Sequence, residues 1–415
     1  MGNGSDGHGE RALSSTTSGQ GSNSVVVRQF NERVILAALR RLGEASKADL
    51  ARQVNLTQNA AGQIVKELER QKLVRTTGKR TGLRGQPATL LQLDPGGAYA
   101  IGVKLGRRTL DSLLVDFSGT VLKTRQHEGP LPLPEEALRI IRDDIAALRR
   151  SLPPTRRARL AGVGLAIPYN LGSWRRELDI QAETCAAWNG FEFIARLRAM
   201  VDAPVFVEND GTAVAVAELF QGHGRELDDF AVVYIGTAVG GGLVLDGNYR
   251  RGATGNAGDV GLIPVPPSPL SSAPRPSGPS DILLTRASIS ALVRHLRANR
   301  VPVTGLRDLE AALDSAPALV GEWIEDCADA LINPLLSIAA VLDLQAIVID
   351  GNLPRPLIQQ LVERLRTLLV AHVPEARVPP DLKVGKIGRN AAAIGAATLP
   401  LHCSYGPDQD MLFGN

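Results

Sequence analysis

The chain has little cysteine, few aromatic residues and no long apolar run, and each absence excludes a class of protein. Its three cysteines, Cys185, Cys327 and Cys403, lie far apart among 415 residues. This excludes a disulfide-rich scaffold and a zinc ribbon built from paired CxxC motifs. No apolar run approaches the roughly 20 residues that a membrane helix needs, and the first residues contain no apolar signal segment. We therefore expect a cytoplasmic protein with no membrane partner.

The charge is unevenly distributed along the chain. Residues 25–94 contain 13 Lys and Arg against 6 Asp and Glu, a local charge of +7, whereas the whole chain carries only +3. A basic segment attached to a mildly acidic body indicates that one end of the chain meets a polyanion. A helical domain with a solvated basic face would produce the same pattern, so the charge alone leaves both interpretations open.

Composition divides the chain into three parts. Residues 1–24 contain six glycines and six serines and almost nothing apolar, which is typical of a disordered tail. Residues 25–94 form a second part that ends in the turn-forming sequence Asp-Pro-Gly-Gly. In residues 95–415, strands alternate with helices, which predicts an α/β fold. Residues 264–279 contain seven prolines and are expected to form a loop, because proline lacks an amide donor.

The basic part has the pattern of a helix-turn-helix. Apolar residues recur at helical spacing in residues 31–42. Ser46 and Thr57 are suitable N-caps for two further helices, 47–54 and 58–71. The last helix turns an amide-rich face outward, and amides pair with base edges while a helix N-terminus meets the DNA backbone. We therefore predict DNA contacts from Thr57, Gln58, Asn59, Gln63 and Lys66.

A basic hairpin follows the third helix. Residues 73–75 and 88–93 can pair, and no acidic residue occurs from 72 to 86. Such a wing would contact phosphates or enter the minor groove, through Arg75, Lys79, Arg80 and Arg84. Three helices with a hairpin also occur in protein-interaction modules, which is the alternative to DNA binding. RNA is disfavoured because Phe30 is the one aromatic residue of this part and offers no stacking platform.

Three motifs in the body carry a family resemblance. They are VFVEND at residues 205–210, IGTAVGGGL at 235–243 and GATGNAGDVG at 252–261. With the N-terminal head, they resemble the ROK family of transcriptional repressors and sugar kinases, from residue 21 to about 400. The resemblance implies a winged helix-turn-helix followed by a two-lobed actin/hexokinase-like ROK sugar-kinase domain. In this fold a sugar binds in the cleft between the lobes.

The same resemblance suggests the ligand-binding residues. Asn209 and Asp210 end a predicted strand, and an amide beside a carboxylate can pair with vicinal hydroxyls. The alternative is that these two residues only cap the next helix. By resemblance, Asp259 and Asp281 stand where the family has glutamates and would also bind the ligand. In family kinases the aspartate matching Asp210 acts as general base.

Departures from the kinase pattern argue against catalysis. Lys104 stands where the kinases have the aspartate of an Asp-x-Gly-Gly-Thr turn, and Arg107 and Arg108 stand where small residues admit phosphates. The change of charge removes a metal anchor, although such a turn could still bind an anion. The glycine-rich residues 236–242 either cradle phosphate or form a tightly packed hairpin, and the damaged first turn favours the hairpin. We therefore expect no kinase activity and assign no catalytic residue.

The family's zinc loop, Cys-x-Cys-Gly-x-x-Gly-Cys, is replaced here by the proline-rich residues 264–279. No ligand set remains, so we predict no structural zinc and no other cofactor.

The sequence thus predicts a DNA-binding transcriptional regulator, a repressor of carbohydrate genes whose operator affinity changes when a sugar or sugar derivative binds the body. One head reads only a short site, so a homodimer or higher homo-oligomer on a pseudo-palindromic operator is expected. Two alternatives remain. One is an ATP-dependent sugar kinase with a fused DNA-binding head, and the other is a constitutive DNA-binding protein whose body only dimerises.

Overall fold

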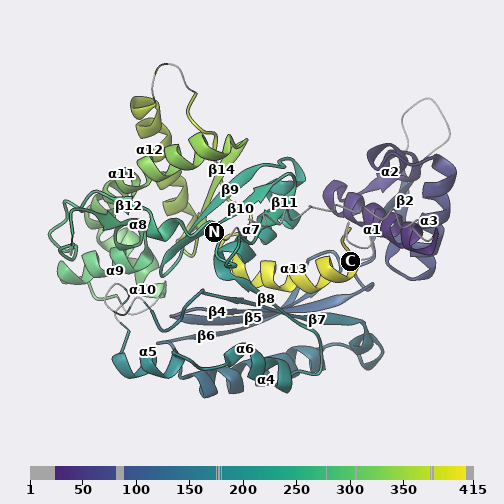
Figure 1. Ribbon diagram of the computed structural model, residues 1–415, viewed down its shortest axis with the longest axis horizontal. Helices are drawn as coiled ribbons and strands as arrows, with labels where there is room; N and C mark the ends of the chain where they lie inside the picture. Colours follow the sequence, from purple (N-terminus) through teal and green to yellow (C-terminus); the bar gives the residue numbers. More distant parts are fainter. Residues whose placement is uncertain are drawn as a thin grey trace, which may run out of the picture.

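The computed structural model describes residues 24–80, 88–173, 180–276, 278–303, 306–373 and 378–407, with the single residues 175, 178 and 375. A small head and a two-lobed body are visible in Figure 1. The expected tail lies almost entirely outside the described residues, as does Arg84. In the described ranges no helix is both long and apolar enough to cross a bilayer.

The head is a winged helix-turn-helix, as predicted. It contains α1 (Ser24–Leu42), α2 (Lys47–Gln53) and α3 (Gln58–Arg70), with a sheet ordered β1-β3-β2. Its strands are β1 (Ala45–Ser46), β2 (Val74–Arg80) and β3 (Ala88–Leu93). Ser46 and Thr57 are the N-caps of α2 and α3, and their side chains accept bonds from Asp49 N and Ala60 N.

Two head elements are longer than predicted. The first helix begins at Ser24 rather than Asn31, since no proline or glycine interrupts residues 24–30 and Arg28 pairs with Glu32 one turn on. Strand β2 continues to Arg80 rather than stopping at Arg75, because an irregularity between Thr76 and Gly78 lets the ladder with β3 resume.

The two lobes of the body repeat one sheet topology. The first sheet has the order β6-β5-β4-β7-β8 and the second β11-β10-β9-β14-β15, and both join an antiparallel meander to two parallel strands. The first sheet consists of β4 (Tyr99–Leu105), β5 (Thr109–Asp116), β6 (Val121–Glu128), β7 (Leu160–Ile167) and β8 (Val205–Asn209). The second consists of β9 (Phe230–Ile235), β10 (Val239–Leu245), β11 (Asn248–Arg250), β14 (Ala346–Gly351) and β15 (Leu382–Val384).

Helices cover the outer face of each sheet. On the first lobe these are α4 (Pro134–Ser151), α5 (Ala182–Trp188) and α6 (Phe193–Met200), with the 3-10 turn η1 (Pro154–Arg159). On the second lobe they are α8 (Leu283–Arg286), α9 (Ile289–Ala298), α10 (Leu306–Ser315), α11 (Pro317–Leu342) and α12 (Arg355–His372). Alternate residues of β9 enter different cores, Val232 toward the centre of the body and Val233 toward the outer helices.

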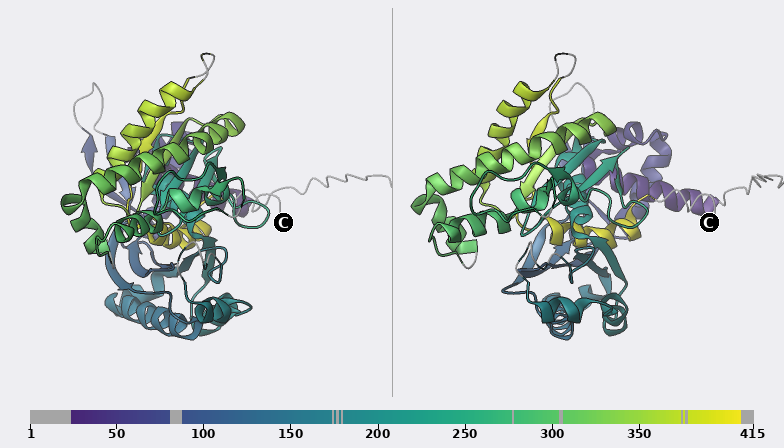
Figure 2. Two further views of the ribbon diagram at one scale, coloured as in Figure 1. Left: turned by 90° about the vertical axis from the view of Figure 1, so that its left-hand side faces the viewer. Right: turned by 60° about the vertical axis from the view of Figure 1, so that its left-hand side comes forward.

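Two helices, α7 (Asp210–Gln221) and α13 (Ala391–Tyr405), lie between the sheets (Figures 1 and 2). Glycines let this layer pack closely. A Cβ on Gly395 would lie 1.7 Å from the carbonyl oxygen of Ala213, and one on Gly164 would lie 1.8 Å from that of Ala396. The middle layer is therefore packed backbone against backbone, which couples the two helices and the first sheet mechanically.

Candidate ligand cavity and DNA-binding surface

A cavity of about 350 Å³ lies between the lobes, a volume that suits a small polar ligand. Its wall combines the β4–β5 turn, the loop after β7, the start of α7, the β9–β10 turn, the segment before η3 (Val260–Leu262) and the start of α13. The glycine-rich residues 236–242 belong to the β9–β10 hairpin, and a hairpin was one of the two structures predicted for them. The same segment also lines the cavity.

Asn209 both caps a helix and faces the cavity. Its Oδ1 accepts a hydrogen bond from Gly211 N at 2.8 Å, which starts α7. Its Nδ2 donates to Oδ1 of Asn256 at 3.0 Å, and Nδ2 of Asn256 donates to Oδ2 of Asp259 at 2.8 Å. The three side chains form one polar chain from the first lobe to the second, and all three line the cavity.

Asp210 follows at the first position of α7. Its Oδ1 accepts from Gly211 N at 3.1 Å. Burial raises the pKa of this carboxyl, while the positive charges of Arg107 and Lys104 act in the opposite direction. Because Asn209 is the N-cap of α7, the carboxylate of Asp210 is not needed to cap the helix and is available to a ligand.

The β4–β5 turn places two cations on the wall. Lys104 Nζ donates to Thr109 Oγ1 at 2.7 Å and lies 3.8 Å from Asp111 Oδ2. Arg107 is buried and donates from Nη2 to the carbonyl oxygen of Asn170 at 2.8 Å. Arg108 is exposed and is not part of the cavity wall.

The other ligand-binding candidates are placed differently. Asp259 lines the cavity, whereas Asp281, on the short strand β13 (Asp281–Ile282), does not. The Oδ1 of Asp281 accepts from Ile282 N at 2.9 Å, and its carboxylate acts electrostatically on Arg294. Asn256 was not among the predicted site residues, although it lies in the third family motif, between Gly255 and Gly258.

Tyr234 and Asn352 also line the cavity and were not predicted. The hydroxyl of Tyr234 donates to Asn352 Oδ1 at 2.6 Å and contacts the carbonyl oxygen of Arg389 at 3.0 Å. Tyr234 is an inward residue of a buried strand, so nothing in its sequence context distinguishes it from a core tyrosine.

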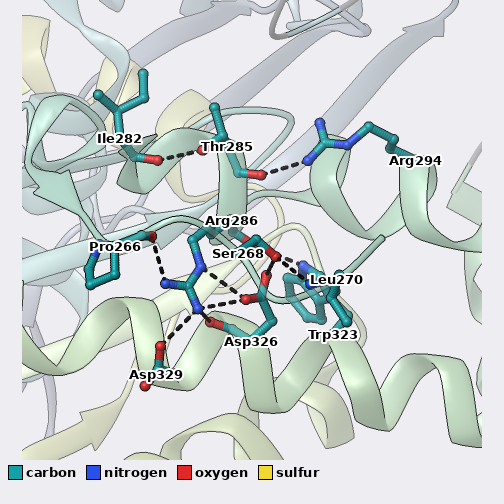
Figure 3. Close-up of polar contacts among 10 residues, drawn as sticks. All are labelled: Pro266, Ser268, Leu270, Ile282, Thr285, Arg286, Arg294, Trp323, Asp326 and Asp329. Carbon is teal, nitrogen blue, oxygen red and sulfur yellow. Dashed lines mark hydrogen bonds and ion pairs between the residues drawn. The ribbon is translucent and has the colours of Figure 1, made fainter. Parts of the chain in front are cut away.

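A buried ion-pair network holds the proline-rich segment (Figure 3). Arg286 is 1 % exposed and bonds Asp326 Oδ1 from Nε and Nη2, at 2.9 and 2.6 Å, and Pro266 O from Nη1 at 3.0 Å. Ser268 Oγ donates to the other carboxylate oxygen of Asp326 at 2.9 Å. Contrary to the expectation of a loop throughout, the segment begins as strand β12 (Pro264–Val265), which pairs with β13. Since Leu284 of α8 lines the cavity, this network fixes part of the cavity wall.

The predicted DNA-binding residues lie on the outer surface of the head. Thr57 and the four predicted contacts on α3 are exposed, as are the wing residues of β2, Arg75, Lys79 and Arg80. Arg80 Nη1 lies 3.2 Å from Asp49 Oδ2, so part of its charge is compensated within the head.

The head contacts the ends of the two middle helices. Arg33 Nη1 donates to the carbonyl oxygens of Cys403 and Gly406, at 3.4 and 3.3 Å, where α13 ends. Arg41 donates from Nε to Arg225 O at 3.2 Å, in the turn η2 (His223–Arg225) that follows α7.

Arg40 lies between these two helix ends. Its guanidinium is 5.4 Å from the ring centre of Phe117 and 5.9 Å from that of Phe220, and burial lowers its pKa to about 10. Phe220 lies on α7, and Phe117 packs edge-on against Tyr405 of α13 with ring centres 4.8 Å apart. The head is therefore in direct contact with both helices that begin at the cavity.

The chain joins a winged helix-turn-helix to a two-lobed, kinase-like body. Comparison with known proteins identifies the family to which it belongs. The ROK family profile matches residues 100–402. The Sinorhizobium fredii protein y4fQ, described as uncharacterized, is 30% identical over 381 residues, which cover 91% of this chain and 92% of that protein. The chain belongs to the ROK family.

More distant relatives include both branches of the family. The Bacillus subtilis xylose repressor is 22% identical, over 58% of this chain and 61% of the repressor. A crystal structure of a ROK transcriptional regulator, a homologue of the E. coli MLC protein, matches 94% of this chain and all of that chain, with a TM-score of 0.66 and 22% identity. A Streptomyces griseus ROK glucokinase in complex with glucose and AMPPNP matches 73% of this chain and 99% of its own, with a TM-score of 0.57 and 23% identity. These structures establish the shared fold.

Proposed function

We propose that the protein is a transcriptional repressor whose head binds operator DNA and whose interlobe cavity binds a carbohydrate that changes operator affinity. The xylose repressor among its relatives supports this function. So does the exposed amide-rich face of α3 beside a basic wing, because these groups suit base edges and phosphates.

The single observation that carries the proposal is the path of α7 and α13. Asp210, at the start of α7, and Ala392, at the start of α13, both line the cavity. Near their opposite ends the two helices contact α1, α7 through Phe220 beside Arg40 and α13 through the carbonyl oxygen of Cys403, which accepts from Arg33. A ligand that draws the lobes together would shift these helices and with them the head, so the two sites can share one conformational equilibrium.

Regulation also requires that the heads of two subunits be placed relative to each other. One helix-turn-helix covers a short half-site, so we propose a symmetric oligomer on a pseudo-palindromic operator. A change in head position on each subunit then changes the spacing between the two recognition helices. Because the half-sites on a stiff duplex are a fixed distance apart, the affinity for the operator changes.

The alternative is an ATP-dependent sugar kinase. The carboxyl of Asp210 in the cavity, with a raised pKa, and the glycine-rich hairpin beside it favour this function. Against it, Lys104 and Arg107 put positive charge on the cavity wall, in the stretch that by sequence resemblance matches the phosphate and metal turn of the family kinases, and like charges repel Mg²⁺. We therefore propose that the body binds a ligand and does not transfer phosphate.

An electrophoretic shift of the protein's own upstream DNA, repeated with a panel of sugars and sugar derivatives, tests the proposal. A specific shift that one compound abolishes or strengthens supports a sugar-responsive regulator. A specific shift that no compound changes supports a constitutive DNA-binding protein. A coupled assay with ATP and the same panel tests the kinase, and turnover that Asp210→Ala abolishes would establish it.

A further inference from the structure

Arg107 is a buried cation whose hydrogen bonds are incomplete. Arg107 is only 8 % exposed, and it lines the cavity. Its recorded bond is from Nη2 to a neutral carbonyl, that of Asn170, and its Nε has no partner in the described part of the chain. A buried guanidinium without a bonded anion is energetically unfavourable, so a group of this kind indicates a missing partner.

The carboxylates of the cavity do not supply that partner. Asp210 and Asp259 act on Arg107 electrostatically, but neither is hydrogen-bonded to it among the described residues. Asp259 instead accepts from Asn256, and Asp210 from Gly211 N. Burial lowers the pKa of Arg107, yet an arginine side chain stays protonated at neutral pH.

Lys104 adds a second positive charge on the same wall. Its Nζ keeps one bond to Thr109 and a longer contact to Asp111, so only part of its donor capacity is used. Arginine binds planar or tetrahedral oxyanions through two parallel N–H bonds, and a neighbouring ammonium group strengthens that binding. The polar chain Asn209–Asn256–Asp259 lines another part of the same cavity and suits hydroxyl groups.

We propose that the effector is an acidic carbohydrate, which carries a carboxylate or phosphate bound by Arg107 and Lys104 and hydroxyls bound by Asn209 and Asp210. This inference rests on the proposed carbohydrate-sensing function and adds the charge of the ligand to it. The alternative role of Arg107 is structural, as a tether for the Asn170 loop, and the test separates the two roles.

The test is titration calorimetry on the full chain. The ligands are a panel of hexoses and pentoses, each as the neutral sugar, the terminal phosphate and the uronic acid, with inorganic phosphate alone as a further probe. The proteins are the wild type, Arg107→Gln and Arg107→Lys, with Arg108→Gln as the matched control, since Arg108 is the adjacent arginine but is exposed and outside the cavity wall. Circular dichroism establishes that each variant is folded.

We expect one acidic member to bind at least about 10- to 100-fold more tightly than its neutral parent, the range expected for a hydrogen-bonded charge pair. Arg107→Gln should remove that difference, Arg107→Lys should keep part of it, and Arg108→Gln should leave it unchanged. Phosphates and uronic acids compared in one panel identify which oxyanion the site accepts. If Arg107→Gln does not fold, the neutral-to-acidic ratio in the wild type and in Arg107→Lys still decides the matter.

Three results would overturn the inference. Neutral sugars that bind as tightly as their acidic derivatives, unaffected by Arg107→Gln, would leave a sugar sensor but no anion site. Inorganic phosphate that binds as tightly as any sugar derivative would show an ion site unrelated to carbohydrate. No binding by any member, while the protein still shifts its upstream DNA, would refute the sensor function together with the inference.

Discussion

Nη1 of Arg41, in the last turn of α1, lies 2.8 Å from Oδ1 of Asp228, between η2 and β9 in the second lobe. This ion pair joins the head to the second lobe of the body, a few residues beyond the end of α7, the helix that starts at the cavity. Both side chains are partly exposed, 39 % and 47 %, so the pair adds only about 0–1 kcal/mol to stability. In the proposed mechanism the pair matters because it lies between the head and the body, where it would transmit a movement of one to the other.

Arg41→Ala should therefore weaken the effect of ligand on DNA binding more than it weakens the fold. We expect an unliganded operator affinity within a few fold of wild type and a smaller ligand-induced change, measured by fluorescence anisotropy. Arg364→Ala is the matched control. It breaks a similarly exposed ion pair, with Glu325 at 2.7 Å, between α12 and α11 in the second lobe. Equal coupling in Arg41→Ala and wild type would exclude this contact from signal transmission.

Comparison of Asn209→Ala with Asp210→Asn should distinguish an effect on the stability of the fold from an effect on ligand binding. Asn209→Ala removes the N-cap of α7 and should lower stability by about 1 kcal/mol, seen as a lower melting temperature. Asp210→Asn keeps the cap, so it should melt close to wild type and bind the operator normally while losing ligand binding. Should Asp210→Asn unfold the protein instead, the carboxylate has a structural role that its contacts do not reveal.

Lys79→Ala on the wing should weaken binding to all DNA sequences alike. Lys79 is exposed on β2 and would contact a phosphate, whose neutralisation releases a counterion. The slope of log affinity against log salt should therefore fall by about one. Lys123 is also exposed but lies on β6 of the body, so Lys123→Ala should leave the slope unchanged. A sequence-dependent loss at Lys79 would mean that the wing reads bases.

Asp49 should make the stability of the head depend on pH in the acid range. Bonds from the backbone N–H and the hydroxyl of Ser46 lower its pKa from 3.8 to about 2. Folding therefore stabilises the ionised carboxylate of Asp49. Its contribution to the stability of the head is complete above about pH 5 and is lost as the pH falls from 3.8 toward 2.

Asp49→Asn should accordingly lower the melting temperature at pH 7, with a difference from wild type that narrows on going to pH 3. Thermal unfolding at the two pH values measures this, with Asp202→Asn as a control because the Asp202 side chain is 98 % exposed. A difference that stays constant with pH would mean that hydrogen-bonding geometry, rather than charge, is lost.

The sequence predicted the elements whose periodicity is unambiguous and missed features that depend on tertiary contacts. The caps Ser46 and Thr57 were predictable because capping is local chemistry. Asn256 became visible as a site residue only when the fold brought it to Asn209 from the other lobe. From the sequence, Arg107 was expected to oppose kinase chemistry in a turn that could still bind an anion, but its burial, with an Nε that has no partner among the described residues, is visible only in three dimensions.

Placement also changed the interpretation of Asp281. A carboxylate at that position in the sequence matches a family ligand, but the local strand pairing with β12 keeps it off the cavity wall. Family resemblance gives the order of motifs along the chain, whereas the direction of a side chain depends on the local strand register.

Linkage between the cavity and the head is most directly tested by measuring ligand affinity with and without DNA. Titration calorimetry would give the ligand Kd for the free protein and for the protein saturated with operator duplex. Coupled sites require these two Kd values to differ by the same factor by which the ligand changes operator affinity. Identical Kd values in the two titrations would show that the cavity and the DNA-binding head act independently, and would contradict regulation through α7 and α13.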